Sequence, residues 1–155
     1  MTDDRTAEMR LRFARQFFDT IPHSRVLGME PIAVGERTLT ARLPYKSEMV
    51  GNPVTGVIHG GVITTLVDQT SGGAVMAALA DSRAVATLDL RIDYMRPATP
   101  GEPVYAHAEC YKLTEQIAFV RCTVYQDDID DPVATSMSTF MRSAEGTPSM
   151  VEGVA

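Results

Sequence analysis

Two kinds of hydrophobic spacing divide this chain into helices and strands. Over residues 6 to 20 the apolar side chains recur every three or four positions, which predicts an amphipathic helix that ends at Pro22. Its arginines lie mostly on the opposite side, so we expect the apolar side to pack on the rest of the domain. The apolar row consists of Met9, Phe13 and Phe17, with Ala14, Phe18 and Ile21 beside it.

A second helix is predicted over residues 60–80, where small, apolar and hydroxyl side chains dominate. Its glycines, threonines and Asp68, without flanking Lys or Arg clusters, argue against a membrane span and favour a central helix inside a globular fold. Helical periodicity groups the following residues on one side: Ile63, Leu66, Val67, Thr70, Ala74 and Ala77. A smaller, more polar stripe occupies the other side: Gly61, Thr64, Thr65, Asp68, Ser71, Gly72 and Val75.

Most of the remaining chain has the character of strands. Residues 31–43 alternate as a single strand before Pro44, and a long loop follows over 45–58. Further strands are predicted at 84–96, 103–113, 116–127 and 132–142. In the first of these four, one face carries Ala86, Leu88, Leu90, Ile92 and Tyr94, and the other carries Thr87, Asp89, Arg91 and Asp93.

A short hairpin is expected around Thr114, between two of these strands. A two-residue turn there would place Cys110 opposite Phe119 and Cys122 opposite His107. The two cysteines are then not cross-strand partners, and we expect both to be reduced core residues.

The elements together predict an α+β fold with a largely antiparallel sheet. A length of 155 residues fits one domain, which we place at 25–142, after a helical extension at 1–24 and before a loose tail at 143–155. The formal net charge of −6 argues against general nucleic-acid binding. The N-terminus lacks the apolar stretch of a signal peptide, so we expect a cytoplasmic protein. Thr, Ala and Met on both sheet faces predict that subunits associate.

Asp68 is the single charged residue between positions 51 and 80. Burying an unpaired carboxylate is costly, so Asp68 is either a catalytic group or a structural carboxylate bonded to backbone groups or to Thr64. The helix begins at Gly60 and Gly61, whose N–H groups and positive dipole end favour an anion or an oxyanion. Asp68 lies about 12 Å further along the helix axis. One substrate carbonyl can therefore contact both only if they come from different subunits, which suggests a dimer.

Two segments carry a resemblance to a known family. Residues 52–61, which end in His59-Gly60-Gly61 with Asp68 after them, and residues 86–98 resemble the hotdog-fold acyl-CoA thioesterases of the PaaI-like group. The resemblance implies a hotdog fold, in which an antiparallel sheet wraps around a long central helix. It also implies homodimers that pair into homotetramers, and hydrolysis of an acyl-CoA thioester without a metal or redox cofactor.

The resemblance also implies roles for individual residues. Asp68 would be the general base that activates water, or the nucleophile. The N–H of Gly60 would polarise the thioester carbonyl from the partner subunit, and His59 would support that loop. Thr87 would help to hold the water. Asn52 would orient the water or the carbonyl, although it precedes the His-Gly-Gly triplet by one residue more than the family spacing.

Substrate contacts are expected from Gly61 and Thr64, and from arginines near the site mouth that bind the phosphates of coenzyme A. The candidate arginines are Arg91, Arg96 and Arg142. The acyl pocket is expected to be lined by the loop before the central helix and by the far part of that helix. Two alternatives remain open: a hotdog hydratase or dehydratase, and a non-catalytic acyl-CoA binding protein.

Overall fold

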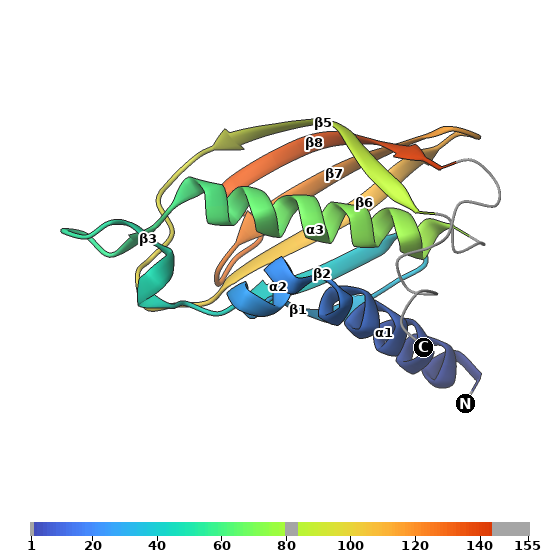
Figure 1. Ribbon diagram of the computed structural model, residues 1–155, viewed down its shortest axis with the longest axis horizontal. Coiled ribbons are helices and arrows are strands. Elements are labelled where there is room, and N and C mark those ends of the chain that lie inside the picture. Colours follow the sequence, from blue (N-terminus) through green and yellow to red (C-terminus); the bar gives the residue numbers. More distant parts are fainter. Residues whose placement is uncertain (1, 80–83, 144–155) are drawn as a thin grey trace.

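The computed structural model describes residues 2–79 and 84–143, with side chains from residue 6 onward. Its helices are α1 (Thr2–Thr20), α2 (Pro22–Leu27) and α3 (Gly60–Ala78), with a short 3-10 helix η1 (Ser47–Met49) (Figure 1). Its strands are β1 (Glu30–Val34), β2 (Thr38–Leu43), β3 (Val50–Asn52), β4 (Val57–Ile58), β5 (Val85–Tyr94), β6 (Val104–Leu113), β7 (Ile117–Tyr125) and β8 (Ala134–Arg142). The predicted tail beyond residue 143 lies outside the described residues.

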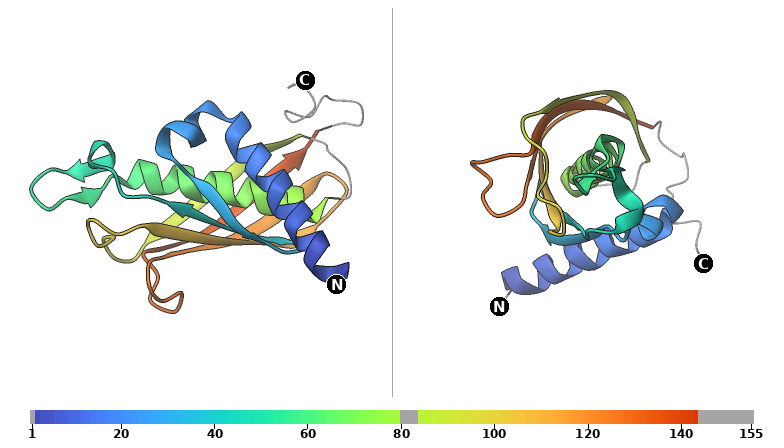
Figure 2. Two further views of the ribbon diagram at one scale, coloured as in Figure 1. Left: turned by 90° about the horizontal axis from the view of Figure 1, so that it is seen from below. Right: turned by 90° about the vertical axis from the view of Figure 1, so that its left-hand side faces the viewer.

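A curved antiparallel sheet encloses α3. Its strands follow the order β1-β2-β6-β7-β8-β5, and every neighbouring pair is antiparallel. Seen end-on, the sheet curls around α3, while α1 crosses beside β1 (Figure 2). The strands β3 and β4 form a separate hairpin near the start of α3 (Figure 1). The predicted α+β class, with a sheet wrapped around a long central helix and an extra N-terminal helix, is confirmed.

The helix predicted over residues 6–20 is present as part of α1, which ends at Thr20, and Pro22 then opens the short helix α2, because a first-turn residue needs no N–H for the helix ladder. One predicted strand, in contrast, is divided in the structure. The single strand predicted over 31–43 is wrong, since β1 and β2 are separated by a turn at residues 35–37. In this turn the Gly35 N–H donates to the carbonyl oxygen of Thr38 at 2.9 Å, and the chain reverses to form a hairpin.

The core lies between α3 and the concave face of the sheet, chiefly at β2, β6 and β7. Gly73 permits this close packing, because a Cβ atom there would lie 2.7 Å from Cδ1 of Leu39 on β2. Burying one large apolar side chain fully contributes about 1.5–3 kcal/mol. Fully buried apolar residues include Leu43, Leu66, Val67, Val75, Val104, Val120 and Val124. In the described part of the chain, no helix combines the length and the hydropathy needed to cross a bilayer.

The small polar stripe predicted on α3 is accurate only near the helix start. Gly61 is exposed, and Thr64 and Asp68 are half-buried, but Ser71, Gly72 and Val75 are buried. The sheet covers these three because it curls around the second half of the helix, where Phe140 of β8 reaches Gly72.

A bulge in β5 changes which side chains face the helix. The pairing of β5 with β8 shifts between Thr87 and Asp89, which makes Leu88 the extra residue. Leu88 is exposed, whereas Leu90 packs against the core. The prediction that Thr87 shares a face with Asp89 is therefore wrong, because a bulge reverses the alternation of side chains. Thr87 lies on the same side as Leu90, facing α3.

The cysteines are not cross-strand partners, as predicted, but their neighbours differ by one residue. Cys110 pairs with Val120 and Cys122 with Ala108, because the turn lies at residues 115–116 and a bulge follows Cys110. Both cysteines are free and buried.

Candidate active site

Asp68 and Thr87 meet where α3 passes beneath the first half of β5. The Thr87 hydroxyl donates a hydrogen bond to Oδ1 of Asp68 at 2.6 Å. A hydroxyl bond to a carboxylate is strengthened by the charge, so it fixes the orientation of the Asp68 side chain. The other oxygen, Oδ2, makes no hydrogen bond with the residues that the structure describes. It is therefore available to accept a proton.

A small pocket of about 160 Å³ surrounds this carboxylate. Phe17 and Ile21 form one wall, and Val85 and Thr87 of β5 form another. The pocket thus lies between the N-terminal helix and the β5 edge of the sheet, above α3. Its walls are mostly apolar, and Thr87, which bonds the carboxylate, is itself exposed to solvent.

The start of α3 forms a second polar cluster. His59 is the N-cap residue, and its Nδ1 accepts a hydrogen bond from the Gly61 N–H at 2.9 Å. An accepting Nδ1 requires the neutral ring with the proton on Nε2. The Gly61 N–H is therefore occupied by His59, whereas the Gly60 N–H has no partner among the described residues. Of the two donors expected to hold an oxyanion, Gly60 provides the available one.

The β3–β4 hairpin holds His59 in this position. The backbone N–H of His59 donates to the carbonyl oxygen of Met49 at 2.8 Å. At Gly51 a Cβ atom would lie 2.7 Å from Cα of His59, so a larger residue would displace the backbone of the loop. The hairpin and η1 therefore fix the direction from which α3 begins.

Tyr94 is a member of this cluster that the sequence reasoning missed. Its hydroxyl donates to the carbonyl oxygen of Gly60 at 2.7 Å and lies 2.9 Å from Oγ1 of Thr64. Thr64 also donates to the Gly60 carbonyl at 3.1 Å. The two hydroxyls hold the Gly60–Gly61 peptide, and Thr64 is thus occupied in bracing the helix start. The sequence feature that could have identified Tyr94 is its position on the predicted strand that also carries Thr87.

Other predicted site residues lie apart from Asp68. Asn52 is exposed on β3, and its Oδ1 accepts from the Val54 N–H at 3.0 Å, as part of the hairpin turn. Arg91 is exposed on β5 and forms an ion pair with Asp93 at 3.1 Å. Arg142 donates to backbone carbonyls of the β6–β7 turn at 3.1 Å.

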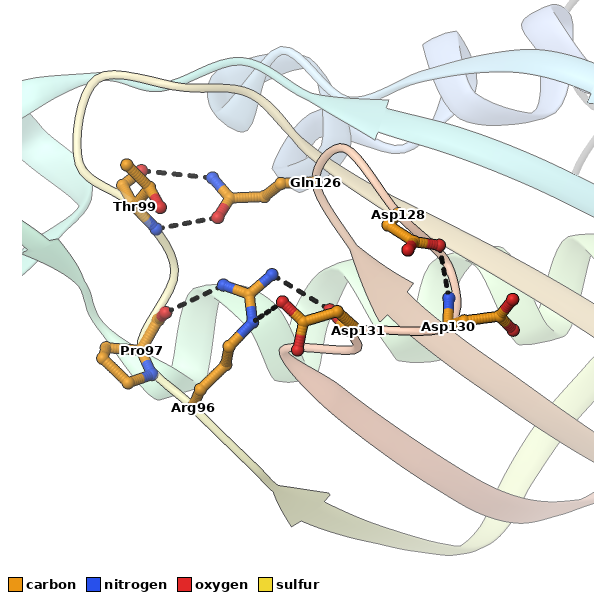
Figure 3. Close-up of polar contacts among 7 residues, drawn as sticks. All are labelled: Arg96, Pro97, Thr99, Gln126, Asp128, Asp130 and Asp131. Atoms are coloured by element: carbon orange, nitrogen blue, oxygen red, sulfur yellow. Dashed lines mark hydrogen bonds and ion pairs between the residues drawn. The ribbon is translucent and has the colours of Figure 1, made fainter.

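Arg96 is engaged with the turn before β8 (Figure 3). Its Nε lies 3.1 Å from Oδ2 of Asp131, and its remaining nitrogens donate to the carbonyl oxygens of Pro97 and Asp131. Close by, the buried side chain of Gln126 forms paired hydrogen bonds with the backbone of Thr99. These contacts tie the connection after β5 to the rest of the sheet, so Arg96 has a structural role at this point.

The cysteines are poor candidates for a nucleophile. Burial raises the pKa of Cys122 to about 12 and also raises the pKa of Cys110 above its ordinary value. A thiol with such a pKa is protonated near neutral pH, and the thiolate is the reactive form. Within residues 2–79 and 84–143, no group of three or more His, Cys, Asp or Glu side chains is placed to hold a metal ion.

Comparisons with known proteins show what this chain and its fold are similar to. The family model of the Thioesterase superfamily matches residues 55–133. A Pseudomonas aeruginosa protein of known crystal structure is 47% identical, with a TM-score of 0.79, over 86% of this chain and 99% of that one. The medium/long-chain acyl-CoA thioesterase YigI of Escherichia coli K12 is 29% identical over 88% of this chain and 96% of its own length. The E. coli PaaI protein shares the fold, with a TM-score of 0.78 at 18% identity, over 89% of this chain and 96% of that one.

The central helix wrapped by an antiparallel sheet, together with these similarities, identifies a thioester hydrolase of the hotdog fold. The chain belongs to the thioesterase superfamily. The likeness to the PaaI-like group, indicated by the His-Gly-Gly triplet and the acid after it, is confirmed. The expected class of enzyme, a thioester hydrolase, is confirmed with it.

Proposed function

We propose that this protein hydrolyses acyl-CoA thioesters to the free acid and coenzyme A, with Asp68 as the general base. The observation that carries the proposal is the Asp68 carboxylate in a small and mostly apolar pocket, held by Thr87 through one oxygen, while no described residue bonds the other. The similarity to YigI, a medium/long-chain acyl-CoA thioesterase, supports an aliphatic acyl group.

The chemical step follows from these positions. The water oxygen attacks the thioester carbonyl carbon, and its proton passes to Oδ2 of Asp68. The tetrahedral intermediate then expels the thiolate as the carbon–sulfur bond breaks, and the proton held by Asp68 returns to the sulfur. The Thr87 hydroxyl keeps the carboxylate aligned during both transfers. Direct attack by Asp68 on the carbonyl carbon is the alternative role for the same residue.

The oxyanion of the intermediate is proposed to bind the Gly60 N–H of a partner subunit. Within one chain Gly60 and Asp68 are about 12 Å apart along α3, too far for one carbonyl to reach both. The edge strand β5 supports a shared site, because it is 10 residues long and its outer edge is unpaired in the described part of the chain. Long exposed edges favour pairing with another strand. We propose a homodimer joined along β5, and a homotetramer formed from two such dimers.

The residues around Gly60 are proposed to position it for this role. Capping of Gly61 by His59 and the hydroxyls of Tyr94 and Thr64 on the Gly60 carbonyl fix the Gly60–Gly61 peptide, which directly follows the His59–Gly60 peptide that presents the N–H. Such preorganised donors stabilise a developing charge without reorganising during the reaction. Arg91 is the exposed arginine of β5 and is the proposed contact for the phosphates of coenzyme A.

Release of free thiol from a panel of acyl-CoA substrates tests the proposal, with the native protein compared with Asp68→Asn. We expect turnover by the native protein and a loss of about a thousandfold in Asp68→Asn, since general bases contribute roughly 10²–10⁴-fold. Circular dichroism should show the same fold for both proteins.

Three other outcomes have distinct meanings. Binding of acyl-CoA without thiol release would identify a binding protein, and interconversion of enoyl and 3-hydroxyacyl groups would identify a hydratase. Unfolding of Asp68→Asn would show that the carboxylate is structural. Each of these results contradicts the proposed function.

A further inference from the structure

A large groove lies beside the Asp68 pocket, under α1. Its volume is about 690 Å³, which falls within the range of small-molecule sites. Met9 and Phe13 of α1 form one side, Met76 and Ala77 from the end of α3 form the other, and Leu39 of β2 contributes to the lining. This groove has no part in the chemical step described above.

The groove and the Asp68 pocket share two wall residues, Phe17 and Met76. The two cavities are therefore neighbours that adjoin at one phenylalanine and one methionine side chain. Methionine is unbranched and adapts its shape easily, so it suits a boundary that a ligand must pass. A ligand with its carbonyl at Asp68 can extend past this boundary into the groove.

The α1 side of the groove presents apolar surface that the rest of the described chain does not cover. Met9 is 67% exposed and Phe13 is 42% exposed, although Ala14, Phe17 and Phe18 of the same helix are buried. The expectation that the whole apolar row packs on the domain is therefore wrong for its first two members. Arg10 is the single charged residue among the lining side chains described, and it lies 3.9 Å from Glu36. The lining suits an uncharged, apolar occupant.

We infer that the acyl chain of the substrate passes between Phe17 and Met76 into this groove, and that α1 sets the preferred chain length. This inference rests on the proposed function. Met9 and Phe17 are eight residues apart, or about 12 Å along α1 at 1.5 Å per residue. An extended chain advances about 1.2 Å per bond, so the groove holds roughly ten carbon atoms. The wall of the acyl site is thus α1 together with the far part of α3, in place of the loop before α3.

A substitution that fills the groove tests the inference. In Ala77→Phe the new ring occupies the space beyond Met76, away from Asp68 and Thr87. Ala7→Phe is the matched control, since Ala7 is exposed on α1 and is not among the groove residues. Values of kcat/KM are measured for straight-chain acyl-CoAs from butanoyl to hexadecanoyl. A calorimetric titration with sodium dodecanoate measures chain binding without any chemical step.

Each buried methylene is worth about a fourfold change in affinity, so blocking two or more costs at least about tenfold. We expect Ala77→Phe to lower kcat/KM for dodecanoyl-CoA, and to weaken dodecanoate binding, by at least about tenfold. Butanoyl-CoA hydrolysis by Ala77→Phe should stay within about twofold of the native rate, and Ala7→Phe should match the native protein throughout.

Equal effects on all chain lengths, or no effect on long chains, would overturn the inference while leaving the proposed function intact. A changed oligomeric state in Ala77→Phe without chain selectivity would also overturn it, because the groove would then be a subunit interface. Failure of the native protein to hydrolyse any acyl-CoA would instead reject the proposed function. Tight binding of dodecanoate to the native protein, weakened in Ala77→Phe, supports the groove independently of hydrolysis.

Discussion

The two sides of α3 face different surroundings. One side packs on β2, β6 and β7, with the apolar side chains of Leu66 and Val67 buried and Gly73 close to Leu39 of β2. The other side carries Asp68, which lines a pocket and is held by Thr87 of β5. One helix therefore provides both the centre of the hydrophobic core and the proposed base. The rigid packing of the first side is what keeps the carboxylate on the second side in a fixed position.

If the two sides are separable, a substitution on the packed side should affect stability and spare the chemistry. Leu66→Ala removes a fully buried side chain and leaves a cavity, so we expect it to lower the free energy of unfolding by about 2–5 kcal/mol. Urea denaturation at a fixed protein concentration measures this loss. The turnover number per folded molecule should remain within about threefold of the native value. A parallel loss of turnover would show that the two sides act as a unit.

A substitution on the side of the pocket should do the reverse, so that it lowers activity and spares stability. Thr87→Val keeps the shape of the side chain but removes the hydroxyl that bonds Asp68. A hydrogen bond to a charged group contributes about 1.5–3 kcal/mol, so we expect a roughly tenfold to hundredfold decrease in kcat. Thr87→Ser keeps the hydroxyl and should recover most of the activity. Equal activities in the valine and serine variants would contradict the assigned role.

The smallest effect is expected at Cys122, a buried thiol of β7, which is one of the strands that pack on α3. Burial raises the pKa of Cys122 to about 12, so its neutral thiol is favoured in the folded state. The resulting stability is present below an ordinary thiol pKa of 9.0 and decreases as the pH rises from there toward 12. At pH 8, iodoacetamide should leave Cys122 unmodified in the native protein and should alkylate it in urea. Mass spectrometry of the tryptic peptide measures both, and rapid labelling of the native protein would contradict the dry environment.

The parts of the molecule that could be predicted from the sequence are those that depend on local patterns of residues. The lone charge and the helical period of residues 60–80 identified α3 and Asp68, and the His-Gly-Gly triplet located the helix start. The bulge in β5 was not predictable, because alternation along one strand does not show how the partner strand pairs with it. From the sequence, Tyr94 could therefore be placed on one face of the predicted strand, but its contacts with Gly60 and Thr64 could not be predicted.

The cavities depend on packing between distant segments. Phe17 was identified as an apolar position of a helix, but its place between the Asp68 pocket and the groove depends on where α1 crosses the sheet. Likewise, α2 and the turn between β1 and β2 follow from short-range backbone geometry that a run of apolar positions does not reveal.

A test of the proposed shared site requires a variant that removes the Gly60 N–H and leaves the helix in place. Gly60→Pro meets this need, because proline is well tolerated at the first helical position and His59 before it is extended, with φ −61° and ψ 133°. Gly60→Ala is the control, since it adds the same Cβ atom near the Tyr94 hydroxyl but keeps the N–H. Loss of one oxyanion donor should lower kcat by about 10²–10³-fold relative to Gly60→Ala.

Mixing subunits of Gly60→Pro and Asp68→Asn tests the central claim most directly. Each variant alone should be nearly inactive. In a randomly mixed dimer preparation, half of the dimers combine both variants, and one of their two sites contains Asp68 from one subunit and Gly60 from the other. We therefore expect recovery of about a quarter of the native activity after subunit exchange. A mixture that stays as inactive as its components would contradict a catalytic site built from two subunits.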